Sequence, residues 1–204
     1  MESLSHQNVP ASTLYVIATP IGNIGDISLR ALHILGLADL IACEDTRTSK
    51  QLLSGYGLSS ELVSAHKHNE REAAGYLIER LKRGERIALV SDAGTPAVSD
   101  PGARIVDAVR EAGLNVVPVP GSSAAITALS ASGLLDEHFL FYGFLPTKNA
   151  QRKDDLKTLT DTRATLIFYE APHRIEETLN ALADIFEPAR RIVIARELTK
   201  LFEE

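Results

Sequence analysis

Cysteine and basic charge are scarce in this 204-residue chain, and tryptophan is absent. The single cysteine, Cys43, excludes an internal disulfide and a cysteine-based zinc site, and it fits a reducing compartment. The formal net charge of −6 excludes a general basic surface for nucleic acid. No apolar run approaches the roughly 18 residues of a membrane span, and the first dozen residues lack a signal-peptide pattern. We therefore expect a cytoplasmic protein with no membrane association.

Short apolar strands alternate with amphipathic helices along the chain, which predicts βαβ units with parallel sheets. The expected strands are residues 14–18, 38–43, 86–91, 115–119, 138–144, 163–169 and 191–196. Three helices have recognisable starts, with Ser28, Asn69 and Asp100 as the predicted N-caps and Pro101 at the first helical position. Further helices are expected to end at Leu53 and to span 122–132, 150–160 and 173–186.

The pattern divides the chain into three parts. Residues 1–12 are polar and expected to be disordered, residues 13–135 form a first α/β domain, and residues 136–204 form a second. The boundary falls where Gly133 ends a helix before a new strand begins. The second domain shows three strands and stops just after a strand, so we expect it to be incomplete and the chain to be a fragment of a longer protein.

Polar loops rich in glycine, proline and acidic residues follow six of the expected strands. They are TPIGNIGD (19–26), CEDTRT (43–48), SDAGTPAVSDPG (91–102), PGSSA (120–124), GFLPTK (143–148) and YEAPHR (169–174). One such loop is weak evidence, because turns favour these residues for backbone reasons. Six together predict a common cleft, because the carboxyl ends of parallel strands share one edge of a sheet.

Several familiar sites are missing from these loops. The first loop has Gly22 and Gly25 without the full G-x-G-x-x-G pattern, and there is no P-loop and no G-x-S-x-G elbow. His66 and His68 lie two residues apart with no obvious third ligand, so we expect no metal site.

The six motifs, in this order and spacing, resemble the tetrapyrrole (corrin/porphyrin) methylase superfamily over roughly residues 13–204. EDTRTS and YEAPHR are most similar to the branch that methylates the ribose 2′-oxygen of a cytidine in small-subunit ribosomal RNA. The resemblance implies an α/β fold of two domains with parallel-rich sheets and S-adenosylmethionine in the cleft between them. It also implies a homodimer, and ribosomal RNA or the assembled small subunit as the substrate.

The resemblance further implies which residues contact the cofactor. These are Asp92, Ala93, Gly94, Thr95, Val98, Ser122, Ser123, Phe144, Leu145, Ala171 and Pro172. Many relatives have proline where this chain has Ser122, which should loosen that turn slightly.

Methyl transfer is an in-line displacement, so catalysis is mostly alignment, and a general base adds roughly 10²–10⁴-fold. The side chains that could serve as this base are Glu44, Asp45, His66, His68, Lys148 and Glu170. We favour the EDTR cluster as catalytic, namely Glu44, Asp45 and Arg47, with Arg47 orienting the substrate or binding phosphate.

RNA binding by an acidic chain requires local cationic clusters. The expected substrate contacts are His68, Asn69, Lys148, Arg152 and Arg174, with Lys153 and Lys157 beside them. A second possible patch comprises Arg47, Lys50, Lys67 and Arg71. Two other functions remain open, a tetrapyrrole methylase and a non-catalytic cofactor-binding module, although the low aromatic content of 5% weighs against a large macrocycle.

Overall fold

The computed structural model describes residues 6–204, so the part of the predicted disordered segment at 1–5 lies outside the described residues. The chain forms two compact units, Met1–Ser123 with Thr199–Leu201, and Ala124–Leu198 with Phe202–Glu204. This division precedes helix α5 (Ala124–Ala131), whereas the predicted boundary at 135/136 follows it. None of the described helices is long and apolar enough to cross a bilayer.

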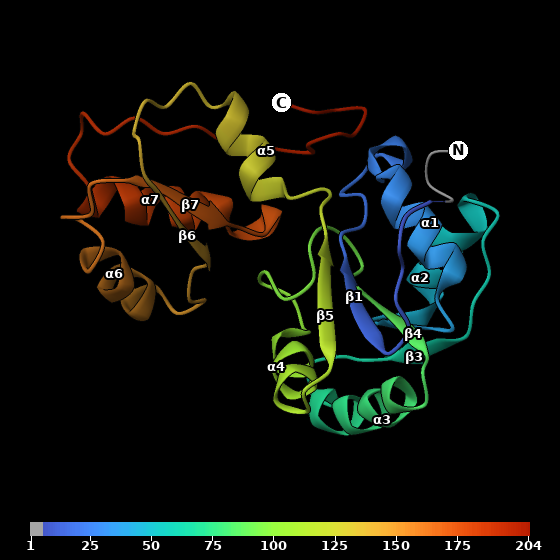
Figure 1. Ribbon diagram of the computed structural model, residues 1–204. Coiled ribbons are helices and arrows are strands. Elements are labelled where there is room, and N and C mark those ends of the chain that lie inside the picture. The colour runs from blue at the N-terminus through green and yellow to red at the C-terminus, as the bar shows by residue number, and fades with distance from the viewer. Residues whose placement is uncertain (1–5) are drawn as a thin grey trace. The chain divides into compact units, whose positions relative to one another are not determined.

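The first unit contains a sheet of five parallel strands in the order β3-β2-β4-β1-β5 (Figure 1). The strands are β1 (Thr13–Ile17), β2 (Leu40–Cys43), β3 (Leu62–Ser64), β4 (Arg86–Val90) and β5 (Asn115–Val119). The helices are η2 (Ile24–Asp26), α1 (Leu29–Leu37), α2 (Thr46–Gly55), α3 (Glu70–Lys82) and α4 (Ala103–Glu111). Strand β3 was not predicted, because three residues are too short to show a period.

Helices cover both faces of this sheet, α1 and α2 on one face and α3 and α4 on the other (Figure 1). Leu14 packs in the cluster that contains Leu77 and Ile105, while the next residue, Tyr15, packs in the cluster that contains Ile34. Because both faces are buried, the strands are continuous apolar runs, as the sequence predicted. Each fully buried aliphatic side chain contributes about 1.5–3 kcal/mol.

The start of α1 follows from a local hydrogen bond. Ser28 caps α1 as predicted, since its hydroxyl accepts a bond of 3.0 Å from the Ala31 N–H.

Part of the predicted disordered stretch is held in place, because the Tyr15 hydroxyl donates to the Pro10 carbonyl at 2.7 Å and the Arg86 guanidinium donates to the Val9 carbonyl at 2.9 Å.

The second unit is built on two parallel strands, β6 (Phe139–Phe144) and β7 (Thr165–Tyr169). Its other elements are α5, α6 (Asn149–Lys157), η3 (Pro172–Arg174) and α7 (Ile175–Ile185). The predicted strand at 191–196 is wrong. That segment has no ladder partner among the described residues, and Ile192 and Ile194 remain more than half exposed.

Candidate active site

Four of the motif loops lie at the carboxyl edge of the first sheet, and two of them are joined directly. Thr19 and Gly94 form an isolated antiparallel bridge with N–H···O distances of 2.9 and 3.0 Å. These residues follow β1 and β4, which are neighbours in the sheet. The chain leaves β1 toward β2 and leaves β4 toward β5, in opposite directions, so the topological switch point lies between them. Open α/β sheets bind ligands at this point.

The SDAGTP loop is ordered by a series of hydroxyl groups. Buried Thr19 donates its hydroxyl to the Ser91 carbonyl at 3.1 Å, and buried Ser91 donates to the Gly94 carbonyl at 3.1 Å. Thr95 then donates to the Ser122 carbonyl at 3.0 Å, which joins this loop to the PGSSA turn after β5. Three of the predicted cofactor contacts, Gly94, Thr95 and Ser122, therefore lie together. Sequence reasoning had not assigned a role to Thr19 or Ser91.

The predicted start of α4 was wrong. The helix begins at Ala103 with Gly102 as its N-cap, so Asp100 and Pro101 belong to the preceding turn. Ala97 and Ser99 both have positive φ, 66° and 62°, and these tight turns carry the chain past Asp100 before a helix can start. Asp100 is therefore not a cap.

Asp100 instead belongs to an acidic group at the sheet edge, with Glu44 and Asp92. Desolvation by burial, followed by the charges of Glu44 and Asp92, raises the pKa of Asp100 to about 6. Asp92 also accepts a hydrogen bond of 3.2 Å from the Asp45 N–H, which links the SDAGTP loop to the EDTR loop. The sequence predicted a role for Glu44 and Asp92 but had read Asp100 only as a cap.

Within the EDTR loop, Asp45 has a structural partner. It caps α2 by accepting from the Arg47 N–H at 2.8 Å, and it forms an ion pair of 2.8 Å with the Arg47 guanidinium. These bonds lower the pKa of Asp45 to about 2. A carboxylate with so low a pKa is a weak proton acceptor, which leaves Glu44 as the stronger base candidate of the loop.

The turn between β3 and α3, residues His66–Asn69, also lies at this edge. Asn69 precedes α3 as predicted, but its side chain makes no cap hydrogen bond. The side-chain Oδ1 of Asn69 accepts from the His66 N–H at 2.7 Å, and its Nδ2 donates to the Ser64 carbonyl at 2.9 Å. Asn69 therefore braces the turn, while His68 is exposed.

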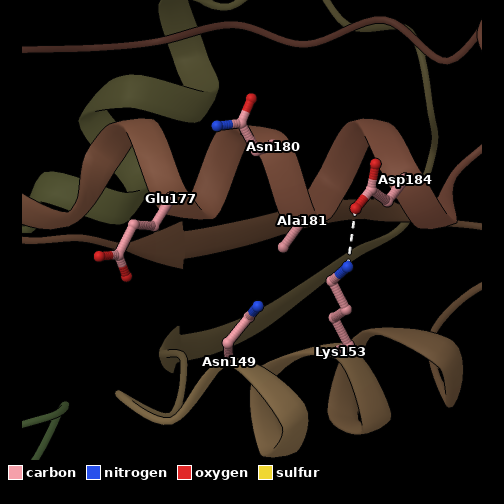
Figure 2. Close-up of a pocket in the computed structure, with 6 residues that line it drawn as sticks. All are labelled: Asn149, Lys153, Glu177, Asn180, Ala181 and Asp184. Carbon is pink, nitrogen blue, oxygen red and sulfur yellow. Dashed lines mark hydrogen bonds and ion pairs between the residues drawn. The ribbon is translucent and has the colours of Figure 1, made fainter.

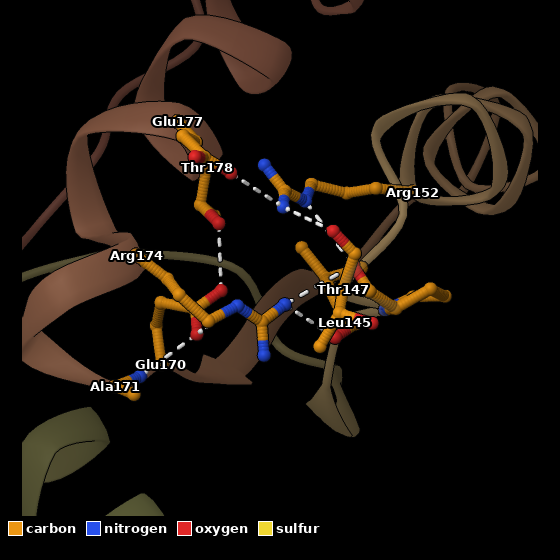
Figure 3. A network of polar contacts seen from close by, with 9 residues as sticks. Leu145, Thr147, Arg152, Glu170, Ala171, Arg174, Glu177 and Thr178 are labelled. Carbon is orange, nitrogen blue, oxygen red and sulfur yellow. Dashed lines mark hydrogen bonds and ion pairs between the residues drawn. The ribbon is translucent and has the colours of Figure 1, made fainter.

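In the second unit, two arginines hold the loop that follows β6 (Figure 3). Arg174 donates to the carbonyls of Leu145 at 2.8 Å and Pro146 at 3.1 Å. Arg152 donates to the carbonyls of Pro146 at 3.2 Å and Thr147 at 3.0 Å. Three consecutive carbonyls, those of Leu145, Pro146 and Thr147, are thus bound by guanidinium groups, and Arg174 joins this loop to the YEAPHR turn.

The predicted substrate contact at Arg152 is wrong, and the one at Arg174 is not favoured. Arg152 is fully buried and forms an ion pair of 3.0 Å with Glu177, so it cannot reach a substrate phosphate. Arg174 lies 3.4 Å from Glu170 in a largely buried pair. Glu170 also accepts from the Ala171 N–H and the Thr178 hydroxyl, so it too is engaged within the unit (Figure 3).

The other predicted residues of the second unit differ in exposure. Phe144, Pro172 and Lys148 are exposed, and Leu145 is buried. A cavity of about 360 Å³ lies between α6 and α7, where Lys153 forms an ion pair of 2.7 Å with Asp184 (Figure 2). Its remaining lining residues are Asn149, Glu177, Asn180 and Ala181.

This fold and the loops at its strand ends define a known class. The family of tetrapyrrole (corrin/porphyrin) methylases matches residues 13–204, and the chain belongs to that family. Two solved structures support the fold. Cobalt precorrin-4 methyltransferase matches with a TM-score of 0.67 at 18% identity, over 97% of this chain and 87% of that one. Uroporphyrin-III-C-methyltransferase from Thermus thermophilus matches with a TM-score of 0.61 at 24% identity, over 87% and 76%.

Over most of its length the chain is similar to family members named ribosomal RNA small subunit methyltransferase I. The protein of that name from Pseudomonas aeruginosa is 53% identical over 193 residues, which cover 95% of this chain and 68% of the relative. The Haemophilus influenzae protein is 53% identical, over 93% and 67%. The Xylella fastidiosa protein is 55% identical, over 94% and 70%.

Proposed function

We propose that this chain transfers a methyl group from S-adenosylmethionine to the ribose 2′-oxygen of a cytidine in small-subunit ribosomal RNA. The observation that carries the proposal is the bridged pair of loops at the switch point of the first sheet, in a chain about half identical to proteins named for this reaction class. Homodimerisation and a cytoplasmic location are part of the same proposal.

The residues of this edge fit the cofactor chemically. S-adenosylmethionine supplies an electrophilic methyl group on a positively charged sulfonium, next to an ammonium group. The carboxylates of Glu44, Asp92 and Asp100 give the edge the opposite charge. Because the sulfonium loses its charge when the methyl group leaves, the same carboxylates should bind the methylated cofactor more tightly than the demethylated product. Exposed Ala93 and Val98 offer apolar surface for the adenine.

The protein's main contribution is alignment. The Thr19, Ser91 and Thr95 hydroxyls fix the main chain of the SDAGTP loop before any ligand arrives, and preorganisation of this kind lowers the entropic part of the barrier. Glu44 is the residue we assign as proton acceptor for the ribose hydroxyl. Asp45 and Arg47 hold the start of α2 through their ion pair and present Arg47, which is exposed, to the substrate.

In the second unit, we assign Phe144, Ala171 and Pro172 as further cofactor contacts. Phe144 is 53% exposed and packs edge-on against Tyr169, so an apolar ring is available next to the YEAPHR turn. Leu145 lies in the small core of the unit, and its carbonyl is bound by Arg174, so its contribution is to hold this loop in place.

The test is a transfer of labelled methyl from S-adenosylmethionine to isolated small ribosomal subunits that lack the modification, followed by nucleoside analysis. We expect the label in 2′-O-methylcytidine. Label in a methylated base would overturn the ribose assignment. Transfer to a precorrin but not to the subunit would identify a tetrapyrrole methylase, and cofactor binding without transfer to either would identify a binding module.

A further inference from the structure

The second unit has fewer free cations than its sequence suggests. Lys153 is paired with Asp184 at 2.7 Å, and Lys157 is paired with Asp154 at 3.0 Å. Arg152 and Arg174 are bound to carbonyls and carboxylates inside the unit. Of the cations expected to contact RNA there, Lys148 is the one that is exposed and forms no ion pair with any described residue.

The His66–Asn69 turn of the first unit has the opposite character. Besides the two bonds made by the Asn69 side chain, the His68 N–H donates to His66 Nδ1 at 3.3 Å and the Asn69 N–H donates to the His66 carbonyl at 2.9 Å. The turn is therefore ordered by its own hydrogen bonds. Lys67 and His68 are exposed at its tip.

Arg71, one residue into α3, adds a second exposed cation beside this turn. Neither Lys67 nor Arg71 forms an ion pair with a residue in the described part of the chain. The nearest acidic neighbour in sequence, Glu70, is buried and bound to the Gly102 N–H, so it does not compete for them. Exposed Glu72 is the remaining carboxylate of this helical turn.

The turn is directly joined to the proposed catalytic loop. The Ser64 hydroxyl donates to the Glu44 carbonyl at 3.3 Å, and the Ala65 N–H donates to the Cys43 carbonyl at 2.7 Å. Lys67 and His68 follow Ala65 by two and three residues, which places this turn beside the loop that carries Glu44.

We infer that the His66–Asn69 turn and Arg71 bind the phosphate backbone of ribosomal RNA beside the methylated nucleotide. This inference rests on the proposed function. Arginine matches phosphate with two parallel N–H donors, and lysine supplies a compact charge. The exposed His68 ring provides a face on which an unstacked base can pack, as in other proteins that bind single-stranded RNA.

The test compares two double variants of equal charge. Lys67→Glu with Arg71→Glu reverses the charge of the proposed surface. The control, Arg83→Glu with Arg110→Glu, reverses the charge of two exposed arginines at the C-terminal ends of α3 and α4. We expect the first variant to bind small ribosomal subunits at least roughly tenfold more weakly, and the control variant to change by less than about threefold. Both should bind S-adenosylmethionine as the unaltered protein does.

The salt dependence of subunit binding gives a second measure. Each lost phosphate contact reduces the log–log slope by about 0.7–0.9, so the Lys67/Arg71 variant should show a slope shallower by roughly 1.5. If both variants weaken subunit binding equally, or if the Lys67/Arg71 variant does not weaken it, the proposed RNA-binding surface is overturned. If the unaltered protein binds cofactor but neither binds nor methylates subunits, the proposed function itself fails.

Discussion

The carboxylate of Glu70 accepts a hydrogen bond of 2.7 Å from the backbone N–H of Gly102, the residue that caps α4. Glu70 opens α3 and is only 7% exposed, so one acidic side chain joins the N-terminal ends of two helices. Gly102 has φ 126°, and a Cβ there would lie 3.2 Å from a methyl group of Leu89. The contact thus anchors the far end of the loop that begins with SDAGTP.

Replacing Glu70 should therefore lower the stability of the protein. Glu70→Ala leaves the buried Gly102 N–H without its partner and should cost about 1–3 kcal/mol of unfolding free energy. Glu70→Gln retains an acceptor oxygen and should lose less. Exposed Glu72, two residues away, is the matched control, and Glu72→Ala should remain within about 0.5 kcal/mol. Urea denaturation of the three variants measures these differences, and equal stability of the two alanine variants would contradict the anchoring role.

Gly94 lies in the loop assigned to the cofactor, and Gly94→Val should abolish S-adenosylmethionine binding. Its φ of 81° strains any β-branched residue, and an added Cβ would point toward Ile21 and the Ser122 carbonyl. Gly113 has a similar φ of 72° with no atom near an added Cβ, so Gly113→Val carries the same strain away from the site. Calorimetry on both folded variants separates the two effects. Unchanged affinity in Gly94→Val would remove this loop from the cofactor site.

Glu44 and Asp45 should behave differently although they are adjacent. Glu44→Gln should lower the maximal rate of methyl transfer by roughly 10²–10⁴-fold, the range of a lost general base, with cofactor affinity within a few-fold. Asp45→Asn keeps an oxygen to cap α2 and, because the pKa of Asp45 is already held at about 2, should alter the rate far less. Arg47→Ala should weaken substrate use without affecting cofactor affinity. Single-turnover rates of methyl transfer measure these differences. A normal rate in Glu44→Gln would show that the EDTR loop has a structural role only.

The acidic group at the sheet edge should make stability depend on pH. Because the pKa of Asp100 rises from 3.8 to about 6 on folding, the folded state binds this proton more tightly than the unfolded chain. Stability should therefore fall as pH rises from about 4 to about 6, and the loss should persist above that range. Asp100→Asn removes the ionisation and should be more stable at pH 8 by on the order of 1 kcal/mol, allowing for partial exposure of the carboxyl.

This difference should disappear at about pH 3, below both pKa values, where Asp100 is mostly protonated in the folded and the unfolded state. Denaturation midpoints of the wild-type protein and Asp100→Asn, measured at about pH 3, 6 and 8, would show this trend. Asp107→Asn, an exposed change on α4, serves as the control and should show no such trend. A stability difference between the wild-type protein and Asp100→Asn that does not grow between about pH 4 and 6 would contradict the assignment.

Several features of this protein could be predicted from the order of its residues alone. Alternating apolar strands and helices predicted the parallel sheet of the first unit, and Asn115–Val119 was located to the residue. The motif loops predicted the family, because each motif is a short continuous stretch that can be recognised without knowing the tertiary structure. Ser28 was recognised as a cap for the same reason, since a cap bonds within its own turn.

Tertiary structure decided what distant residues do to one another. From its neighbours in sequence Asp100 looks like a helix cap, but Ala97 and Ser99 have positive φ and α4 begins only at Ala103. The N-cap is Gly102, and its N–H donates to Glu70 from another helix. Arg152 looks like a surface cation, yet packing buries it against carbonyls of the GFLP loop. The segment 191–196 has strand-like residues, but a strand forms only where a neighbour supplies a ladder. Periodicity and caps are local properties, whereas burial, ion pairing and strand pairing depend on partners that the sequence does not place.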